Sequence, residues 1–230
     1  MKIISFYNPK GGVGKSTLNI LLCNYIQYYL NKKVVFINAA TQKGVEEKRT
    51  TDEYILERDG KQDILNRLYP IYSIASEDLY DILVEAKSSE SNVDYMVVDL
   101  PGNYHQKGII SNLALVDYMF IPLQGGQLEI IDTKEFISYL QKEVTPIRKK
   151  YQLPDIDISI CLNKVKAGSK ELQFALDYFE QDTGVPLIKE YITDSQSNLQ
   201  TKLNTYKVVK IPGSHKIHDF CISIMNKINL

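Results

Sequence analysis

The chain has 230 residues, of which 44% are hydrophobic, so it can bury one large core and its length favours one domain or at most two. Lys and Arg number 27 against 28 Asp and Glu, and the net charge of −1 argues against a protein that coats nucleic acid by bulk charge. No apolar run of 18 residues and no signal peptide is found, which predicts a soluble, cytoplasmic protein.

Apolar, β-rich segments alternate with helical patterns along the chain. The predicted strands are residues 2–7, 33–38, 95–99, 118–122, 156–162 and 187–192. Residues 18–30 are predicted to form the first helix, because apolar side chains recur along one face. This alternation predicts an α/β fold, with a mostly parallel central sheet and helices on both faces.

Residues 44–91 are the hardest part to assign. The charge run at residues 46–49 predicts a solvated helix face, and residues 77–87 predict a second helix. Pro70 and Tyr72 are expected in a connection or a short strand before that helix. Three widely spaced cysteines with apolar neighbours predict small core residues rather than disulfides or a metal site: Cys23, Cys161 and Cys221.

A glycine-rich loop at residues 8–17 follows the first predicted strand, with the sequence Asn-Pro-Lys-Gly-Gly-Val-Gly-Lys-Ser-Thr. Its glycines let backbone N–H groups turn toward an anion, the next helix adds its positive end, and Lys15 supplies a charge for the β- and γ-phosphates of ATP. Ser16 offers a hydroxyl to Mg²⁺. The predicted nucleotide-binding residues are Lys10, Gly11, Gly12, Val13, Gly14, Lys15, Ser16 and Thr17.

The spacing of this loop departs from the ordinary phosphate-binding pattern, because Pro9 stands at the first glycine position and Lys10 is an additional lysine. With this deviant Walker A motif the chain resembles the ParA/MinD family of dimeric P-loop ATPases, and most of all its small single-domain partition members. The resemblance implies that Lys10 reaches across an ATP-bound homodimer to the partner's phosphates, and that Lys10 and Lys15 are catalytic. It also implies one ParA-like domain over residues 1–230, without an N-terminal helix-turn-helix domain.

Two further positions lie at the carboxyl ends of predicted strands. Ligands collect at these strand ends in α/β sheets. Asp99 is placed like a Walker B acid that anchors Mg²⁺ through water, together with Ser16. Residues 100–103 resemble the switch II loop of the family. Asn163 aligns with the family asparagine that helps to hold adenine, with a strand-end turn residue as the alternative. Residues 187–195 lack the family's Ile-Pro before its adenine-side loop.

The chain departs from its family at residues 38–42, where Asp-x-Asp-Pro-Gln is replaced by Asn-Ala-Ala-Thr-Gln. Asn38 and Ala40 thus replace two acids, the second of which orients the attacking water in relatives. Losing that carboxylate is expected to slow hydrolysis by about 10²–10⁴-fold while ATP binding is spared.

Three explanations are open: Ala40 is an engineered change that traps ATP, the natural protein is a slow or inactive ATPase, or an acid elsewhere substitutes. The first is favoured, because alanine is the usual choice for deleting a side chain and the loop is otherwise intact.

The C-terminal residues 201–230 carry five lysines and one acid, a net charge of +4, while the other 200 residues sum to −5. This asymmetry favours contacts with DNA phosphates over the alternative of a solvated basic end. The candidate DNA-binding residues are Lys202, Lys207, Lys210 and Lys216. The first functional hypothesis is therefore a ParA-like switch in plasmid or chromosome partition, which binds nonspecific DNA and a ParB-like partner and is associated with the nucleoid.

The second hypothesis is a MinD-like ATPase that acts at a membrane surface, because apolar residues recur at helical spacing over 217–228. The polar face of this segment has few cations to attract an anionic bilayer. A helix packed on the sheet is therefore favoured, and a membrane is the less favoured partner. His215 and His218 lie three residues apart without a third ligand, which makes a poor metal site and favours a solvated or DNA-facing pair.

Overall fold

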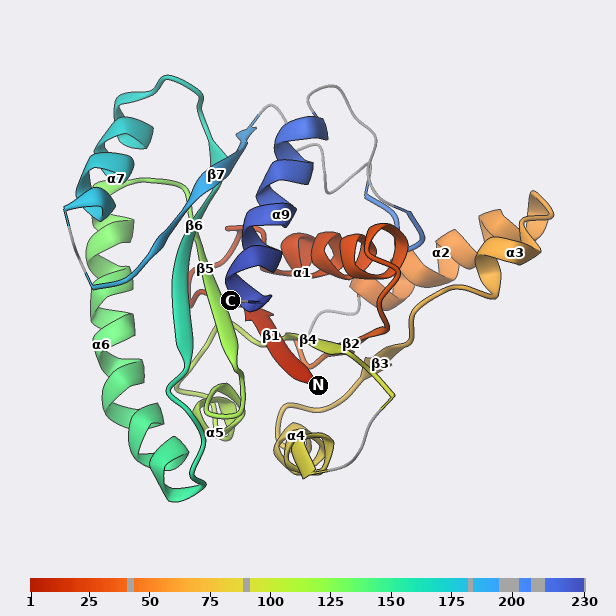
Figure 1. Cartoon of the computed structure of the whole chain (residues 1–230), viewed down its shortest axis with the longest axis horizontal. Helices are drawn as coiled ribbons and strands as arrows, with labels where there is room; N and C mark the ends of the chain where they lie inside the picture. The colour runs from red at the N-terminus through yellow and green to blue at the C-terminus, as the bar shows by residue number, and fades with distance from the viewer. Residues whose placement is uncertain (41–43, 89–91, 182–183, 195–202, 208–213, 230) are drawn as a thin grey trace.

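Seven parallel strands form one sheet in the order β3-β2-β4-β1-β5-β6-β7 (Figure 1). The structure, a computed structural model, describes residues 1–40, 44–88, 92–181, 184–194, 203–207 and 214–229. The strands are β1 Lys2–Phe6, β2 Val34–Asn38, β3 Ile71–Ser73, β4 Tyr95–Asp99, β5 Tyr118–Leu123, β6 Asp157–Val165 and β7 Leu187–Thr193. The predicted α/β fold is confirmed, and the short strand near Tyr72 is present as β3 at the edge of the sheet.

Helices cover both faces of this sheet, as predicted (Figure 1). On one face lie α4 Leu79–Ser88, α5 Ile109–Leu113, α6 Gln127–Lys150 and α7 Lys170–Glu180. On the other lie α1 Lys15–Asn24, its π-helical continuation η1 Tyr25–Tyr29 and α9 Ser214–Asn229. Helices α2 Gly44–Arg58 and α3 Gln62–Leu65 extend outward beyond the β3 side (Figure 1). The first helix therefore begins at Lys15, directly after the glycine loop, and not at the predicted residue 18.

Two apolar clusters fill the space between the sheet and these helix layers. Successive side chains of a strand point to opposite faces, so Ile3 of β1 belongs to the first cluster and Ile4 to the second. Both are fully buried, which explains why β1 is apolar at consecutive positions. The helix layers on both faces thus fix the position of β1, and with it the start of the loop that follows.

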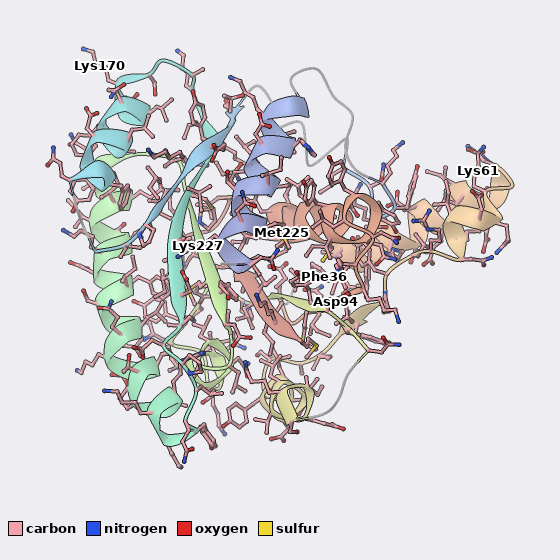
Figure 2. All side chains as sticks on the ribbon, viewed as in Figure 1. Phe36, Lys61, Asp94, Lys170, Met225 and Lys227 are labelled. Atoms are coloured by element: carbon pink, nitrogen blue, oxygen red, sulfur yellow. The ribbon has the colours of Figure 1, made fainter. Side chains whose placement is uncertain are left out.

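Helix α9 packs its apolar side chains into the second cluster, as the sequence predicted. Its buried residues are Ile217, Phe220, Cys221, Ile224, Met225 and Ile228. Figure 2 labels Met225 in the crowded interior, whereas Lys61 and Lys170 lie at opposite ends of the molecule. The three cysteines are buried and free, which confirms their prediction as core residues. Within the described ranges, none of the helices combines the length and apolarity that crossing a bilayer requires.

The charge run at residues 46–49 is not simply a solvated helix face, and that prediction was wrong in part. Arg49 is buried and donates to the carbonyl oxygen of Tyr69 at 2.8 Å and to the hydroxyl of Thr205 at 2.7 Å. Glu46 is half-buried and accepts hydrogen bonds from the end of β2, while Glu47 is exposed. The cause is that Arg49 lies on the buried face of α2, together with Val45, Asp52 and Leu56.

Candidate nucleotide site

A cavity of about 620 Å³ lies at the carboxyl edge of the sheet, within the size range of small-molecule sites. Three segments form its wall: the glycine loop with the start of α1, the end of β4 with the next residues, and the first turns of α2. Its lining includes Gly11, Gly12, Gly14, Lys15, Ser16, Thr17, Ala40, Asp99, Pro101, Gly102 and Asn103. The fold therefore brings the predicted phosphate loop, Asp99 and the switch-II-like segment together.

The end of β6 supports the glycine loop through two side-chain hydrogen bonds. Gly12 and Gly14 have φ values of 78° and 95°, in the left-handed region that favours glycine. The Asn163 amide donates to the carbonyl oxygen of Val13 at 2.7 Å, and the Lys164 ammonium donates to that of Gly12 at 2.8 Å. Both contacts engage loop carbonyls, so neither uses a loop N–H group that an anion needs.

Asn163 is buried and supports the loop, and it is not among the residues that line the cavity. Its predicted contact with adenine stays a prediction. Two apolar side chains that the sequence analysis did not single out, Ile20 and Leu203, do line the cavity. Leu203 is separated from the loop by most of the chain, so only the folded structure identifies it.

The side chain of Lys15 is bonded to the backbone of Lys10, and the side chain of Asn8 holds that backbone in place. Asn8 pins the loop to β5 by donating to the Pro122 carbonyl at 2.9 Å, and its Oδ1 accepts from the Lys10 N–H at 2.8 Å. The Lys15 ammonium donates to the Lys10 carbonyl oxygen at 2.8 Å. Burial lowers the pKa of Lys15, an effect that the negative charge of Asp99 opposes. The acceptor of the Lys15 ammonium is thus a neutral carbonyl, and a phosphate oxygen can take its place.

The side chain of Lys10 is 52% exposed, and its Nζ lies 3.5 Å from Glu129 Oε1. Glu129 is in the first turn of α6 and its side chain is only 3% exposed. Its Oε2 accepts from the Gln124 N–H at 2.8 Å, while Oε1 has no hydrogen-bond partner among the described residues. In the single chain, therefore, the ion pair with Glu129 holds Lys10 beside the cavity; its reach across a dimer stays a prediction.

Asp99 is 1% exposed at the end of β4. Its Oδ1 accepts from the Asn19 amide at 3.0 Å, and Asn19 in turn accepts from the Phe6 N–H at 3.0 Å. Burial raises the pKa of Asp99 to about 6; hydrogen bonds from Ser16 and Asn19 oppose the rise, while the charge of Glu46 adds to it. The second carboxylate oxygen, Oδ2, has no hydrogen-bond partner in the described part of the chain.

A buried carboxylate oxygen without a donor, beside the Ser16 hydroxyl, fits a hard divalent cation. Across the described ranges, no group of three or more His, Cys, Asp or Glu side chains is arranged to hold a metal ion. Ser16 and Asp99 suit Mg²⁺, because this ion is usually bound by one or two protein oxygens together with water and substrate phosphates. Both predicted metal residues, Ser16 and Asp99, meet at this end of the cavity.

At the departure from the family pattern, Asn38 is 3% exposed and Ala40 lines the cavity. The Asn38 amide nitrogen donates to both oxygens of Glu46, at 2.7 and 2.9 Å, and its Oδ1 accepts from the Ala40 N–H at 3.1 Å. Gln42 lies outside the described residues. The sequence analysis missed Glu46, the partner of Asn38, because it lies within a charge run, and for the same reason it missed Lys48, which lines the cavity.

The predicted DNA-binding lysines are only partly described. Lys202 and Lys210 lie outside the described residues, whereas Lys207 and Lys216 are exposed. Their ammonium groups lie 5.3 Å from the ring centre of Tyr206 and 5.9 Å from that of Tyr191, respectively. Neither lines the cavity, so a DNA role for them stays a prediction.

The histidine pair is also described in part. His218 packs its ring against Tyr29, with ring centres 4.5 Å apart, and is half-buried. The end of the first helix thus covers His218 in part, and a solvated or DNA-facing role for the pair stays a prediction.

Comparison with known proteins identifies the family and similar folds. Residues 1–167 match the family described as AAA domain. No curated protein is matched by the sequence. A Borrelia burgdorferi B31 protein assigned to plasmid partition and bound to AMPPNP shares 17% identity, with 98% of each chain covered and a TM-score of 0.68.

Two further solved structures have similar folds. The MinC:MinD cell division complex of Aquifex aeolicus matches with 20% identity, 98% and 96% coverage and a TM-score of 0.64. The pNOB8 ParA bound to nonspecific DNA matches with 15% identity, 99% and 98% coverage and a TM-score of 0.57. With the deviant glycine loop, the acid at the end of β4 and the parallel sheet in one structure, the chain belongs to the AAA domain family of the ParA/MinD type.

Proposed function

We propose that the chain is an ATP-dependent dimerisation switch that hydrolyses ATP slowly and acts in plasmid or chromosome partition. The observation that carries this proposal is the cavity itself, in which the glycine loop, Lys15, Ser16 and Asp99 lie together with Lys10 at its edge. Each group matches one part of a Mg²⁺–ATP complex: backbone N–H groups and Lys15 face the phosphates, and the two oxygen ligands face the cation.

The residues present support ATP binding more fully than hydrolysis. Bound Mg²⁺ supplies neutralisation of the phosphate charge, and Ser16 and Asp99 would hold it. When ATP binds, the Lys15 ammonium would donate to phosphate oxygens in place of the Lys10 carbonyl. Hydrolysis needs a water aligned with the γ-phosphorus, and Ala40 offers that water no hydrogen bond. We therefore expect tight ATP binding with slow release of ADP and phosphate.

Dimerisation is tested by measuring the molecular mass in solution with and without Mg²⁺–ATP. We expect a monomer without nucleotide and a dimer with ATP, because Lys10 is half-exposed and available to a second copy. Lys10→Ala should lose the dimer while it still binds ATP, and Lys32→Ala, a change at an exposed lysine outside the cavity, is the control. A monomer at saturating ATP, or a dimer that does not depend on ATP, would contradict the switch.

Nonspecific DNA is the proposed surface on which the dimer acts, with a ParB-like protein as the partner that stimulates hydrolysis. The support is the exposed Lys207 and Lys216, together with the nonspecific DNA in the similar pNOB8 ParA structure. A MinD-like role is the alternative, but most apolar side chains of α9 are buried in the core, and Ile222 is the one exposed large apolar side chain in the described part of this helix.

The two roles are separated by duplex-DNA binding and liposome co-sedimentation, each with ATP and at two salt concentrations. Salt-sensitive DNA binding without liposome binding is expected, and it would place the dimer at the nucleoid in the cytoplasm. Liposome binding without DNA binding would instead support the MinD-like role.

A further inference from the structure

Glu46 is held in one orientation at the end of β2 and β3. Its carboxylate accepts two hydrogen bonds from the amide of Asn38, at 2.7 and 2.9 Å, and another from the hydroxyl of Ser73. Asn38 and Ser73 are neighbours in the parallel register of these strands. A glutamate in a solvated charge run would have no such fixed partners, so this carboxylate has a defined place in the fold.

That place is next to the cation end of the cavity. Asn38, which binds Glu46, is paired with Asp99 in the register of β2 and β4. Asn38 thus connects Glu46 to the strand position beside Asp99. On α2, Gly44, Val45 and Lys48 line the cavity, while Glu46 lies directly behind this lining and is not part of it.

Asn38 and Glu46 are chemically matched. The amide nitrogen of Asn38 is a hydrogen-bond donor only, and the ionised carboxylate of Glu46 is an acceptor only. An aspartate at position 38, as in the family pattern, would put two carboxylates within hydrogen-bond distance of each other, where both cannot stay ionised at low cost. The chain thus keeps the negative charge that an aspartate at position 38 would carry, but on α2 instead of β2.

We propose that Glu46 supplies, from helix α2, the carboxylate that the family places at position 38, and that it is a positioning residue for the divalent cation of the bound nucleotide. The inference rests on the proposed function, because it concerns the same Mg²⁺–ATP site. Asn38 and Ser73 fix the direction of the carboxylate, and its charge strengthens cation binding at Asp99 and Ser16. This favours a substituting acid as the explanation for position 38, while Ala40 remains without one.

The test is the Mg²⁺ concentration needed for half-maximal binding of a fluorescent ATP analogue. Glu46→Gln keeps the size of the side chain and an acceptor for Asn38, but removes the charge. We expect it to raise the required Mg²⁺ about 10-fold, with unchanged affinity for the analogue in EDTA. Glu47→Gln removes the same charge from the exposed neighbouring residue and should leave the Mg²⁺ requirement at the wild-type value.

A swapped pair separates charge from structure. In the double variant Asn38→Asp with Glu46→Gln, the carboxylate returns to β2 and the amide moves to α2, so the Mg²⁺ requirement should return to within about threefold of wild type. Equal requirements in Glu46→Gln and Glu47→Gln would overturn the proposal, as would a swapped pair as impaired as Glu46→Gln. If the wild-type chain bound the analogue with no Mg²⁺ dependence, the proposed function itself would fail, and this inference with it.

Discussion

Replacement of Gly14 by alanine is expected to destabilise the nucleotide-free protein by about 2–4 kcal/mol, from two separate costs. The φ of 95° at Gly14 lies in the left-handed region, where an L-residue loses about 1–2 kcal/mol. The new Cβ would lie 2.4 Å from Asn163 Nδ2, so Asn163 must move. That movement breaks its hydrogen bond to the Val13 carbonyl and leaves buried polar atoms unpaired, at about 1–2 kcal/mol.

Urea unfolding of the nucleotide-free protein measures this cost, with Gly11→Ala as the matched control. A Cβ at Gly11 meets nothing within 4 Å, and its φ is not left-handed, so this variant should stay within about 0.5 kcal/mol of wild type. Comparison within one loop removes effects common to any glycine-to-alanine change, such as a less flexible unfolded chain.

Asn163→Ala identifies the source of the cost. In that background the side chain that would clash with the new Cβ is absent, so Gly14→Ala should cost only its backbone part, about 1–2 kcal/mol. Two results would refute the reasoning: a Gly14→Ala variant as stable as Gly11→Ala, or an equal cost of Gly14→Ala with and without Asn163.

Three other variants test the site. Glu129→Gln frees Lys10 from its ion pair, which is worth about 1 kcal/mol or less because Lys10 is half-exposed, so ATP-dependent dimerisation measured by sedimentation should tighten about 2–5-fold; weaker dimerisation would contradict this. Asp99→Asn in EDTA should stabilise the protein by at most about 3 kcal/mol at pH 7 and much less at pH 4.5, measured by urea unfolding. The sign follows because the pKa of Asp99 is about 6 in the folded state and 3.8 as the ordinary value, so wild-type stability is lost as pH rises through 6; a gap independent of pH would oppose this. Ala40→Asp should raise single-turnover hydrolysis about 10²–10⁴-fold at similar ATP affinity, and equal rates would reject the assignment of position 40.

The sheet was largely predictable because its central strands are short apolar runs. Residues 95–99, for example, were predicted as a strand and form β4 with all five residues buried. The edge strand β3 was only anticipated as a connection or a short strand, since Tyr72 is 54% exposed and no apolar run marks it. The start of the first helix was misplaced because polar Lys15, Ser16 and Thr17, which the helical pattern does not include, form its first turn.

The candidate site was predictable where its chemistry is local in sequence. The loop at residues 8–17 and the acid at the end of β4 follow rules that need no tertiary contacts, and the structure brings them together. Glu46 and Glu129 could not be assigned this way, because their partners depend on how α2 and α6 dock against the sheet. In the sequence each is a carboxylate in a charged helix; in the fold Glu129 pairs with Lys10, and Glu46 accepts hydrogen bonds from Asn38.

Helix α9 gives the phosphate loop a late support during synthesis. Phe220 of α9 stacks on Phe6, the last residue of β1, and the Ile228 carbonyl accepts a hydrogen bond from Lys2 at the start of that strand. Residues 214–229 leave the ribosome after every other described element, so until then this face of β1 is covered by α1 without α9. A nascent chain that ends before α9 contains the complete loop sequence but lacks the contacts of Phe220 and Ile228 with β1, so the chain length at which ATP is first retained would report when these contacts form.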